Sequence, residues 1–194
     1  MVFLAMLLAA AIASPPAGEL QCGDEARLLN QDITTFDQDP RDGWRSVANR
    51  PGCRAHAADL LRAYRAMLQM RLDGLVWHEG QLRAELGQTA EAIRLFRRAR
   101  RPDVVLGQSQ VIWNAYVDAT IAFLESDRAA LLGARARLAA TPTPTIMGRQ
   151  SDGSLRASKP ARQPNLDVVD GLIACFGRPY AEAYGSSDCR PESR

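Results

Sequence analysis

The residues best suited to acid–base chemistry in this sequence are its two histidines, His56 and His78. His78 belongs to the run Trp77-His78-Glu79, in which a base and a carboxylate are neighbours. Adjacent residues of a helix point in different directions, so these two side chains do not form a ready dyad. Glu79 is better placed to pair with Arg83, one turn further on, at a helix surface. His56 lies at the edge of an apolar helical stripe, as packed or capping histidines do, so neither histidine predicts an active site.

The motifs of well-known enzyme classes are missing from the sequence. There is no Gly-x-Ser-x-Gly elbow, no His-Glu-x-x-His pattern and no glycine loop followed by a phosphate-binding lysine. Paired carboxylates can hydrolyse glycosides, but the acidic candidates fit solvated helix faces more simply: Glu85, Asp118, Glu125 and Asp170. We therefore predict no catalytic residue, no metal ligand and no cofactor. A cell-envelope hydrolase of unfamiliar type is kept as an alternative.

A cluster of arginines stands at the end of one predicted helix. Its members are Arg94, Arg97, Arg98, Arg100 and Arg101. Cations are favoured there by the helix dipole. A nucleic-acid site would call for interleaved aromatic residues or a reading motif, and the formal net charge of the chain is only +2. We therefore predict no nucleic-acid partner.

The elements that would position these residues are helices. Gly87 separates two patterns with helical spacing, and the second forms one apolar stripe: Ala92, Ile93, Leu95, Phe96 and Ala99. A short turn between two such helices requires them to lie antiparallel.

This helix pair resembles the tetratricopeptide repeat family. Small residues and one aromatic stand at matching relative positions, namely Gly80, Gly87, Ala92, Phe96 and Ala99. Pro102 falls two residues early, and Glu79 and Arg83 replace the usual Leu and Tyr. A second copy spans residues 113–142, because the interval of fifteen residues from Gly87 to Pro102 recurs from Asp127 to Pro142.

The resemblance implies a concave groove lined by the first helix of each pair. By position, Trp77 and Gln81 would face this groove from the first pair, and Asn114 from the second. Trp113, Tyr116 and Asp118 lie nearby and are further binding candidates, because aromatics with polar tips often anchor interfaces. The alternative for each tryptophan is a place in the core.

The N-terminal residues indicate export. Residues 2–13 are uninterruptedly apolar, too few to span a bilayer, and end in Ala11-Ile12-Ala13, an A-x-A cleavage pattern. Residues 1–13 are therefore predicted to be a signal peptide, with a buried N-terminal helix as the alternative. The mature protein would be periplasmic or secreted and would lack a transmembrane segment.

The four cysteines fit that compartment. None lies in a C-x-x-C pair, and no histidine stands at zinc-ligand spacing from them. An even number of cysteines in an exported protein points to disulfides. Three connectivities are possible, of which we favour Cys22–Cys53 and Cys175–Cys189, each closing a local loop worth roughly 3 kcal/mol. Free buried thiols are the alternative.

The predicted organisation has three parts after the signal peptide. Residues 20–140 form a helical repeat-like domain, 141–164 a proline-rich linker, and 165–189 a C-terminal capping helix with a disulfide-closed tail. The fold class is all-α, a short superhelix of antiparallel helix pairs similar to tetratricopeptide repeats. The function expected is an exported interaction or assembly module that binds a peptide or protein partner. A structural subunit without a ligand site is a further alternative, and the oligomeric state is open.

Overall fold

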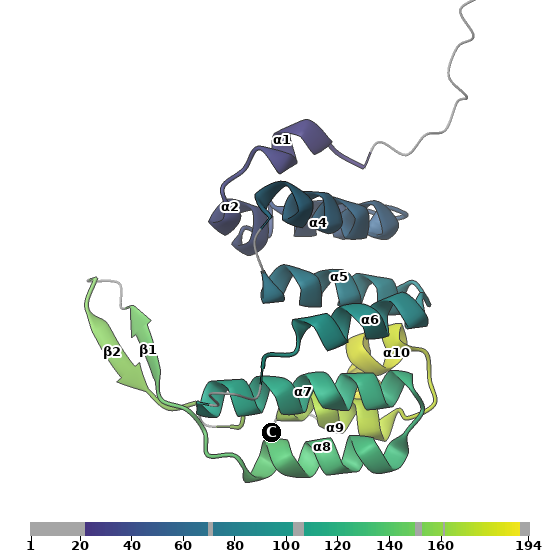
Figure 1. The fold of residues 1–194 in the computed structure, drawn as a ribbon, viewed down its shortest axis with the longest axis vertical. Helices are drawn as coiled ribbons and strands as arrows, with labels where there is room; N and C mark the ends of the chain where they lie inside the picture. The colour runs from purple at the N-terminus through teal and green to yellow at the C-terminus, as the bar shows by residue number, and fades with distance from the viewer. Residues whose placement is uncertain (1–21, 70–71, 103–106, 150–152, 161, 191–194) are drawn as a thin grey trace, which may run out of the picture.

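The computed structural model describes residues 22–69, 72–102, 107–149, 153–160 and 162–190. The predicted signal peptide, residues 1–13, lies outside these ranges. Within them the chain is mostly helical, and its longer helices lie in successive layers (Figure 1). These helices are α4 (Arg54–Leu68), α5 (Asp73–Glu85), α6 (Thr89–Ala99), α7 (Gln108–Leu124) and α8 (Arg128–Ala140).

Shorter elements stand at both ends of this stack and beside it. Before α4 come α1 (Glu25–Leu29), α2 (Ile33–Gln38) and α3 (Trp44–Ala48). After α8 come β1 (Ile146–Arg149), β2 (Leu155–Ser158), α9 (Leu166–Ala174), α10 (Tyr180–Gly185) and a final 3₁₀ turn, Ser187–Cys189. Helix α9 contacts α7 and α8, while α10 contacts α5 and α9.

Local sequence signals explain where several helices begin and turn. The Asp32 carboxylate accepts hydrogen bonds from the amides of Thr34 and Thr35 at the start of α2, and Asp127 accepts one from Ala130 in α8. Between α5 and α6, Gly87 adopts φ +74°, a left-handed conformation that glycine takes without steric cost. This turn lets α6 fold back along α5.

Adjacent helices pack in pairs, most extensively α5 with α6 and α7 with α8. The close approach of the first pair depends on Gly80. A Cβ atom at this position would lie 2.7 Å from a ring carbon of Phe96, whose side chain is fully buried. The predicted apolar stripe of α6 is indeed its buried face, with Ala92, Leu95, Phe96 and Ala99 in the core.

The central helix α5 belongs to two hydrophobic cores. Its Leu75 and Leu82 pack with α1 to α4, whereas Val76, Trp77 and Ala84 pack with α6 to α10. Because α5 is covered on opposite sides, little of its surface is left for water. Its polar residues are therefore drawn into the interior.

The proline-rich segment contains structure that the sequence did not predict. Strands β1 and β2 pair antiparallel, from Ile146 opposite Ser158 to Arg149 opposite Leu155. The hairpin projects from the side of the helical stack (Figure 1), and all four residues of β2 are exposed. The fold is thus mostly helical rather than all-α, because this segment adds a small sheet.

Disulfides join Cys22 to Cys53 and Cys175 to Cys189, the connectivity favoured from the sequence. The first bond ties the chain before α1 to the start of α4, and the second ties α9 to the final 3₁₀ turn. Two disulfides are consistent with an extracellular, non-cytoplasmic protein.

Among the helices of the described ranges, none has the length and apolar character needed to cross a membrane.

Candidate binding groove

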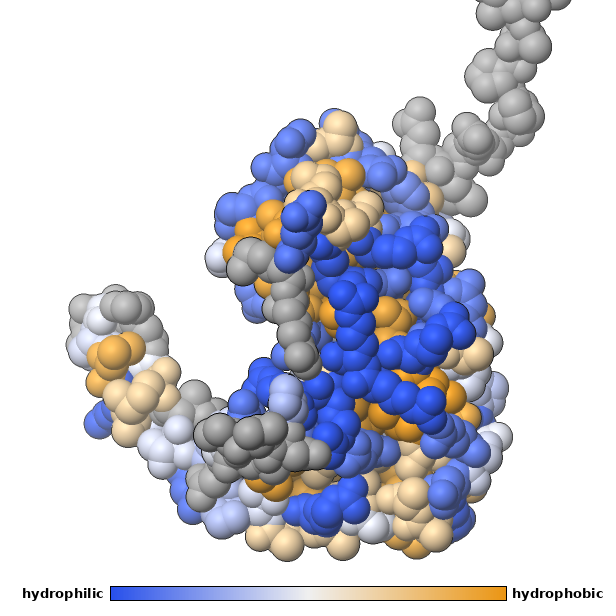
Figure 2. All heavy atoms as spheres, in the orientation of Figure 1, coloured by the Kyte–Doolittle hydropathy of each residue, from blue (hydrophilic) through white to orange (hydrophobic). Residues whose placement is uncertain are grey.

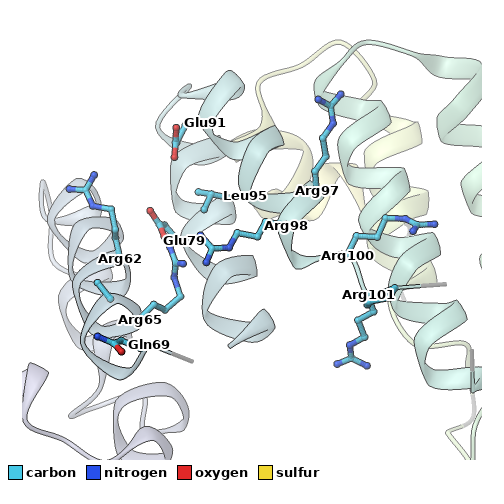
Figure 3. A pocket seen from close by; sticks show the side chains of 12 residues that line it. Arg62, Arg65, Gln69, Glu79, Glu91, Leu95, Arg97, Arg98, Arg100 and Arg101 are labelled. Atoms are coloured by element: carbon cyan, nitrogen blue, oxygen red, sulfur yellow. Dashed lines mark hydrogen bonds and ion pairs between the residues drawn. The ribbon is translucent and has the colours of Figure 1, made fainter. Parts of the chain in front are cut away.

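A groove of ≈ 980 Å³ lies between α4 and α6, above α5. Figure 3 shows its side chains, which come from α4, α5 and α6 and from the segment after α6. On the face shown in Figure 2, hydrophilic side chains gather in a band across the middle of the molecule. The groove is lined by Arg62, Arg65, Ala66, Gln69, Glu79, Glu91, Leu95, Arg97, Arg98, Arg100, Arg101 and Pro102.

The charge of the groove is strongly positive. Its lining contains six arginines against two glutamates. Several of the arginines already have acidic partners: Arg62 with Asp59 at 3.0 Å, Arg97 with Glu125 at 2.5 Å, Arg100 with Asp118 at 3.1 Å and Arg101 with Asp73 at 3.9 Å. None of those four partners is part of the lining, so the groove presents cations to whatever enters it.

Arg98 is different from these arginines. Within the described ranges its side chain has neither an ion pair nor a hydrogen bond. Its side chain is exposed and extends across the groove toward α4 (Figure 3). It is therefore a cation ready to accept an anionic group without giving up a protein partner.

The floor of the groove holds a buried charge network. Glu79 is only 1% exposed and accepts a hydrogen bond from Arg65, whose side chain is 8% exposed. The Glu79 carboxylate also lies 3.8 Å from Arg83, which in turn donates to Asp59 at 2.6 Å. The prediction of a Glu79–Arg83 pair at the helix surface was therefore wrong in its location, because α5 is covered on both sides and the pair lies inside.

This network is not fully satisfied. The Nε atoms of Arg65 and Arg83 are buried without a hydrogen-bond partner among the described residues. Buried polar atoms in native proteins usually have partners. Arg65 also lines the groove, but its Nε atom is itself buried, so this unmet hydrogen-bonding capacity lies beneath the groove surface.

The two histidines are not assembled into an active site. His78 lines a smaller cavity of ≈ 330 Å³ with Trp44, Arg54, Gln81 and Glu85, among others. Its Nε2 lies 3.2 Å from the Arg45 guanidinium and 3.6 Å from the nearer oxygen of Asp37. A guanidinium can only donate, so Nε2 is the acceptor, and Nδ1–H donates to Gln81 at 3.2 Å.

Both ring nitrogens of His78 are thus occupied, and the carboxylate is beyond ordinary hydrogen-bond distance. Burial lowers the pKa of His78, against the opposing effects of Gln81 and Asp37. In the same cavity, burial raises the pKa of Glu85, which Arg54 opposes from 3.1 Å. The lining contains no serine, threonine or cysteine, and its one hydroxyl is the phenol of Tyr184. This arrangement gives the hydrolase alternative no support.

Three of the predicted binding residues lie in the core. Trp77, Asn114 and Tyr116 are each 4% exposed. The ring of Trp77 packs against those of Phe96, Trp113 and Tyr116 at centroid distances of 4.5, 5.1 and 4.7 Å. These aromatic residues join α5, α6 and α7. Trp77 and Tyr116 therefore pack in the core and do not face the partner that the sequence had suggested.

The other three predicted residues make structural contacts at partly exposed positions. The indole N–H of Trp113 donates to the carbonyl of Ala99 at 2.9 Å, which closes the end of α6. Asp118 pairs with Arg100 and with Arg137 at 3.1 Å each. Gln81 holds His78. None of the six predicted residues lines the groove between α4 and α6.

The groove residues were visible in the sequence only in part. The cluster from Arg97 to Arg101 was noted, but as a charged helix end. That Arg62 and Arg65 of α4 stand opposite it depends on α4 packing against α5, which no local pattern reveals. In the parts of the chain that the structure describes, no group of three or more metal-binding side chains is found.

No protein-family model, curated protein or solved structure matches this chain. The groove itself is therefore the basis for a functional assignment.

Proposed function

We propose that this protein is an exported interaction module that binds a segment of a polypeptide partner in the groove between α4 and α6. The observation that carries the proposal is a groove of ≈ 980 Å³ across which Arg98 extends, a cation with no ion-pair partner in the part of the chain that the structure describes. Interaction sites of this size hold several residues of a partner chain.

The packed helix pairs suit such a role. Like tetratricopeptide repeats, they offer a stack of helices along which a partner segment can lie. The binding surface we propose differs from the one that the resemblance implies, because its walls are formed by α4 and α6 and not by α5 and α7. The two disulfides support a periplasmic or secreted location.

Selection from a random peptide library displayed on phage tests this function without assuming a ligand. Selected peptides are then measured against two variants, Ala66→Trp and Ala136→Trp. Both alanines are exposed and helical, but Ala66 lines the groove and Ala136 lies on α8. A bulky ring in the groove should weaken binding by about ten-fold or more, whereas the α8 variant should bind within about two-fold of the wild type.

Circular dichroism of both variants establishes that each is folded. The proposal is abandoned if no peptide is enriched, or if the enriched peptides bind Ala66→Trp as tightly as Ala136→Trp.

A further inference from the structure

We infer that the groove recognises an extended, acidic polypeptide segment, and that Arg98 is the main residue that binds its carboxylates. This inference rests on the proposed function and names the chemistry of the partner. It follows from three features of the groove: the type of cation, the length of the walls and the absence of aromatic side chains from the lining.

Arginine is the cation suited to carboxylates. Its planar guanidinium presents two parallel N–H groups that match the two oxygens of a carboxylate. Among the described residues no acid competes for Arg98, and the Arg101–Asp73 contact is long at 3.9 Å. Arg62 pairs with Asp59 at the surface, where both side chains are at least half exposed, so water screens that pair and its strength is small.

The walls set the length of the segment. On one wall, the lining runs from Arg62 to Gln69, the residue that caps the end of α4. On the other it runs from Glu91 to Arg98 on α6, seven helical steps that span about 10 Å. An extended chain rises about 3.3 Å per residue, so about three residues fit between the walls. One or two further residues of the bound chain would reach the segment after α6, where Arg101 lies.

The lining argues against other anions. None of its residues is aromatic, whereas single-stranded nucleic acids bind through stacking on aromatic rings. Glu91 and Gln69 are acceptors that backbone N–H groups of a peptide can use. Leu95 and Ala66 are also in the lining, where they can contact aliphatic side chains of the bound segment.

Fluorescence anisotropy with labelled synthetic peptides tests the inference. One peptide carries five consecutive glutamates and aspartates between Gly-Ser flanks, and its control carries glutamine and asparagine at the same positions. The acidic peptide should bind at least about ten-fold more tightly than the amide control, since a hydrogen bond to a charged group is the stronger kind. Its affinity should fall as salt is raised.

Variants of α6 identify the residue responsible. Arg98→Gln should weaken binding of the acidic peptide by about ten-fold, and Arg98→Glu by more. Arg94→Gln removes the same charge from the same helix but lies outside the groove lining, paired with Glu91. It should change the affinity by less than about two-fold.

Three results would overturn the inference. The amide peptide binds as tightly as the acidic one; Arg94→Gln weakens binding as much as Arg98→Gln; or a single-stranded oligonucleotide binds more tightly than the acidic peptide through Arg98. The phage selection distinguishes a failure of this inference from a failure of the proposed function. Enriched peptides that depend on the groove but lack acidic residues would refute the inference and leave the function standing, whereas no groove-dependent peptide would refute the function.

Discussion

Replacing Glu79 with glutamine should destabilise the protein by about 3 kcal/mol, because it leaves a buried arginine without a counter-charge. Breaking a buried ion pair by removing one partner costs about 3–5 kcal/mol. The lower end applies here, since the glutamine amide oxygen still accepts one hydrogen bond, and Arg83 keeps Asp59 at 2.6 Å. Arg65, 8% exposed in its side chain, loses its carboxylate partner.

The matched control is Glu91→Gln. The Glu91–Arg94 pair likewise joins a carboxylate to a guanidinium, but its side chains are 39% and 67% exposed. Exposed pairs contribute about 0–1 kcal/mol, so a loss of about 0.5 kcal/mol is expected. In urea unfolding followed by circular dichroism, with a slope of about 2 kcal/mol per molar, the midpoint should fall by about 1.5 M for Glu79→Gln and about 0.25 M for Glu91→Gln. Equal shifts, or a loss below about 1 kcal/mol at Glu79, would refute the burial argument.

Three further predictions concern helix packing, a disulfide and a histidine. Gly80→Ala should lower the free energy of unfolding by about 1–3 kcal/mol, because its Cβ would lie 2.7 Å from an aromatic carbon of α6. The control is Gly74→Ala, whose Cβ would have nothing within 4 Å. It should raise the free energy of unfolding by about 0.5 kcal/mol in the same urea assay. Replacing both Cys175 and Cys189 by alanine opens a bridge of sequence separation 14 and should cost about 3 kcal/mol, and a thermal midpoint equal to that of the wild type would contradict this. The pKa of His78 is lowered by burial, so the unfolded chain takes up a proton first as the pH falls below about 6.5, and stability should decrease from there down to the native pKa. A pH–stability profile for His78→Gln should lack that decrease, and identical profiles would show that His78 does not titrate differently on folding.

The sequence predicted the helices whose apolar residues recur at helical spacing. The stripe of α6 and the turn at Gly87 are local features, so they can be read without knowledge of neighbouring elements. The hairpin of β1 and β2 could not be read in this way. Its second strand is exposed on every residue, so it carries no alternation between a buried and a solvated face.

The candidate site was largely hidden from the sequence for a related reason. Charged residues are usually solvated, so Glu79 was expected at the surface. Its burial follows from α5 lying between two cores, which is a property of the whole fold. The aromatic residues Trp77 and Tyr116 were expected to bind a partner, but the same position between helices makes them core residues.

The most direct test of the central claim is the location of a bound peptide. Backbone amide chemical shifts of the isotope-labelled protein, recorded while the acidic peptide is added, should change most at residues 62–69 at the end of α4, at 91–98 of α6 and at Arg101. A contradictory result would be changes centred on the cavity around His78 or on the hairpin, with the amides of α4 and α6 unmoved.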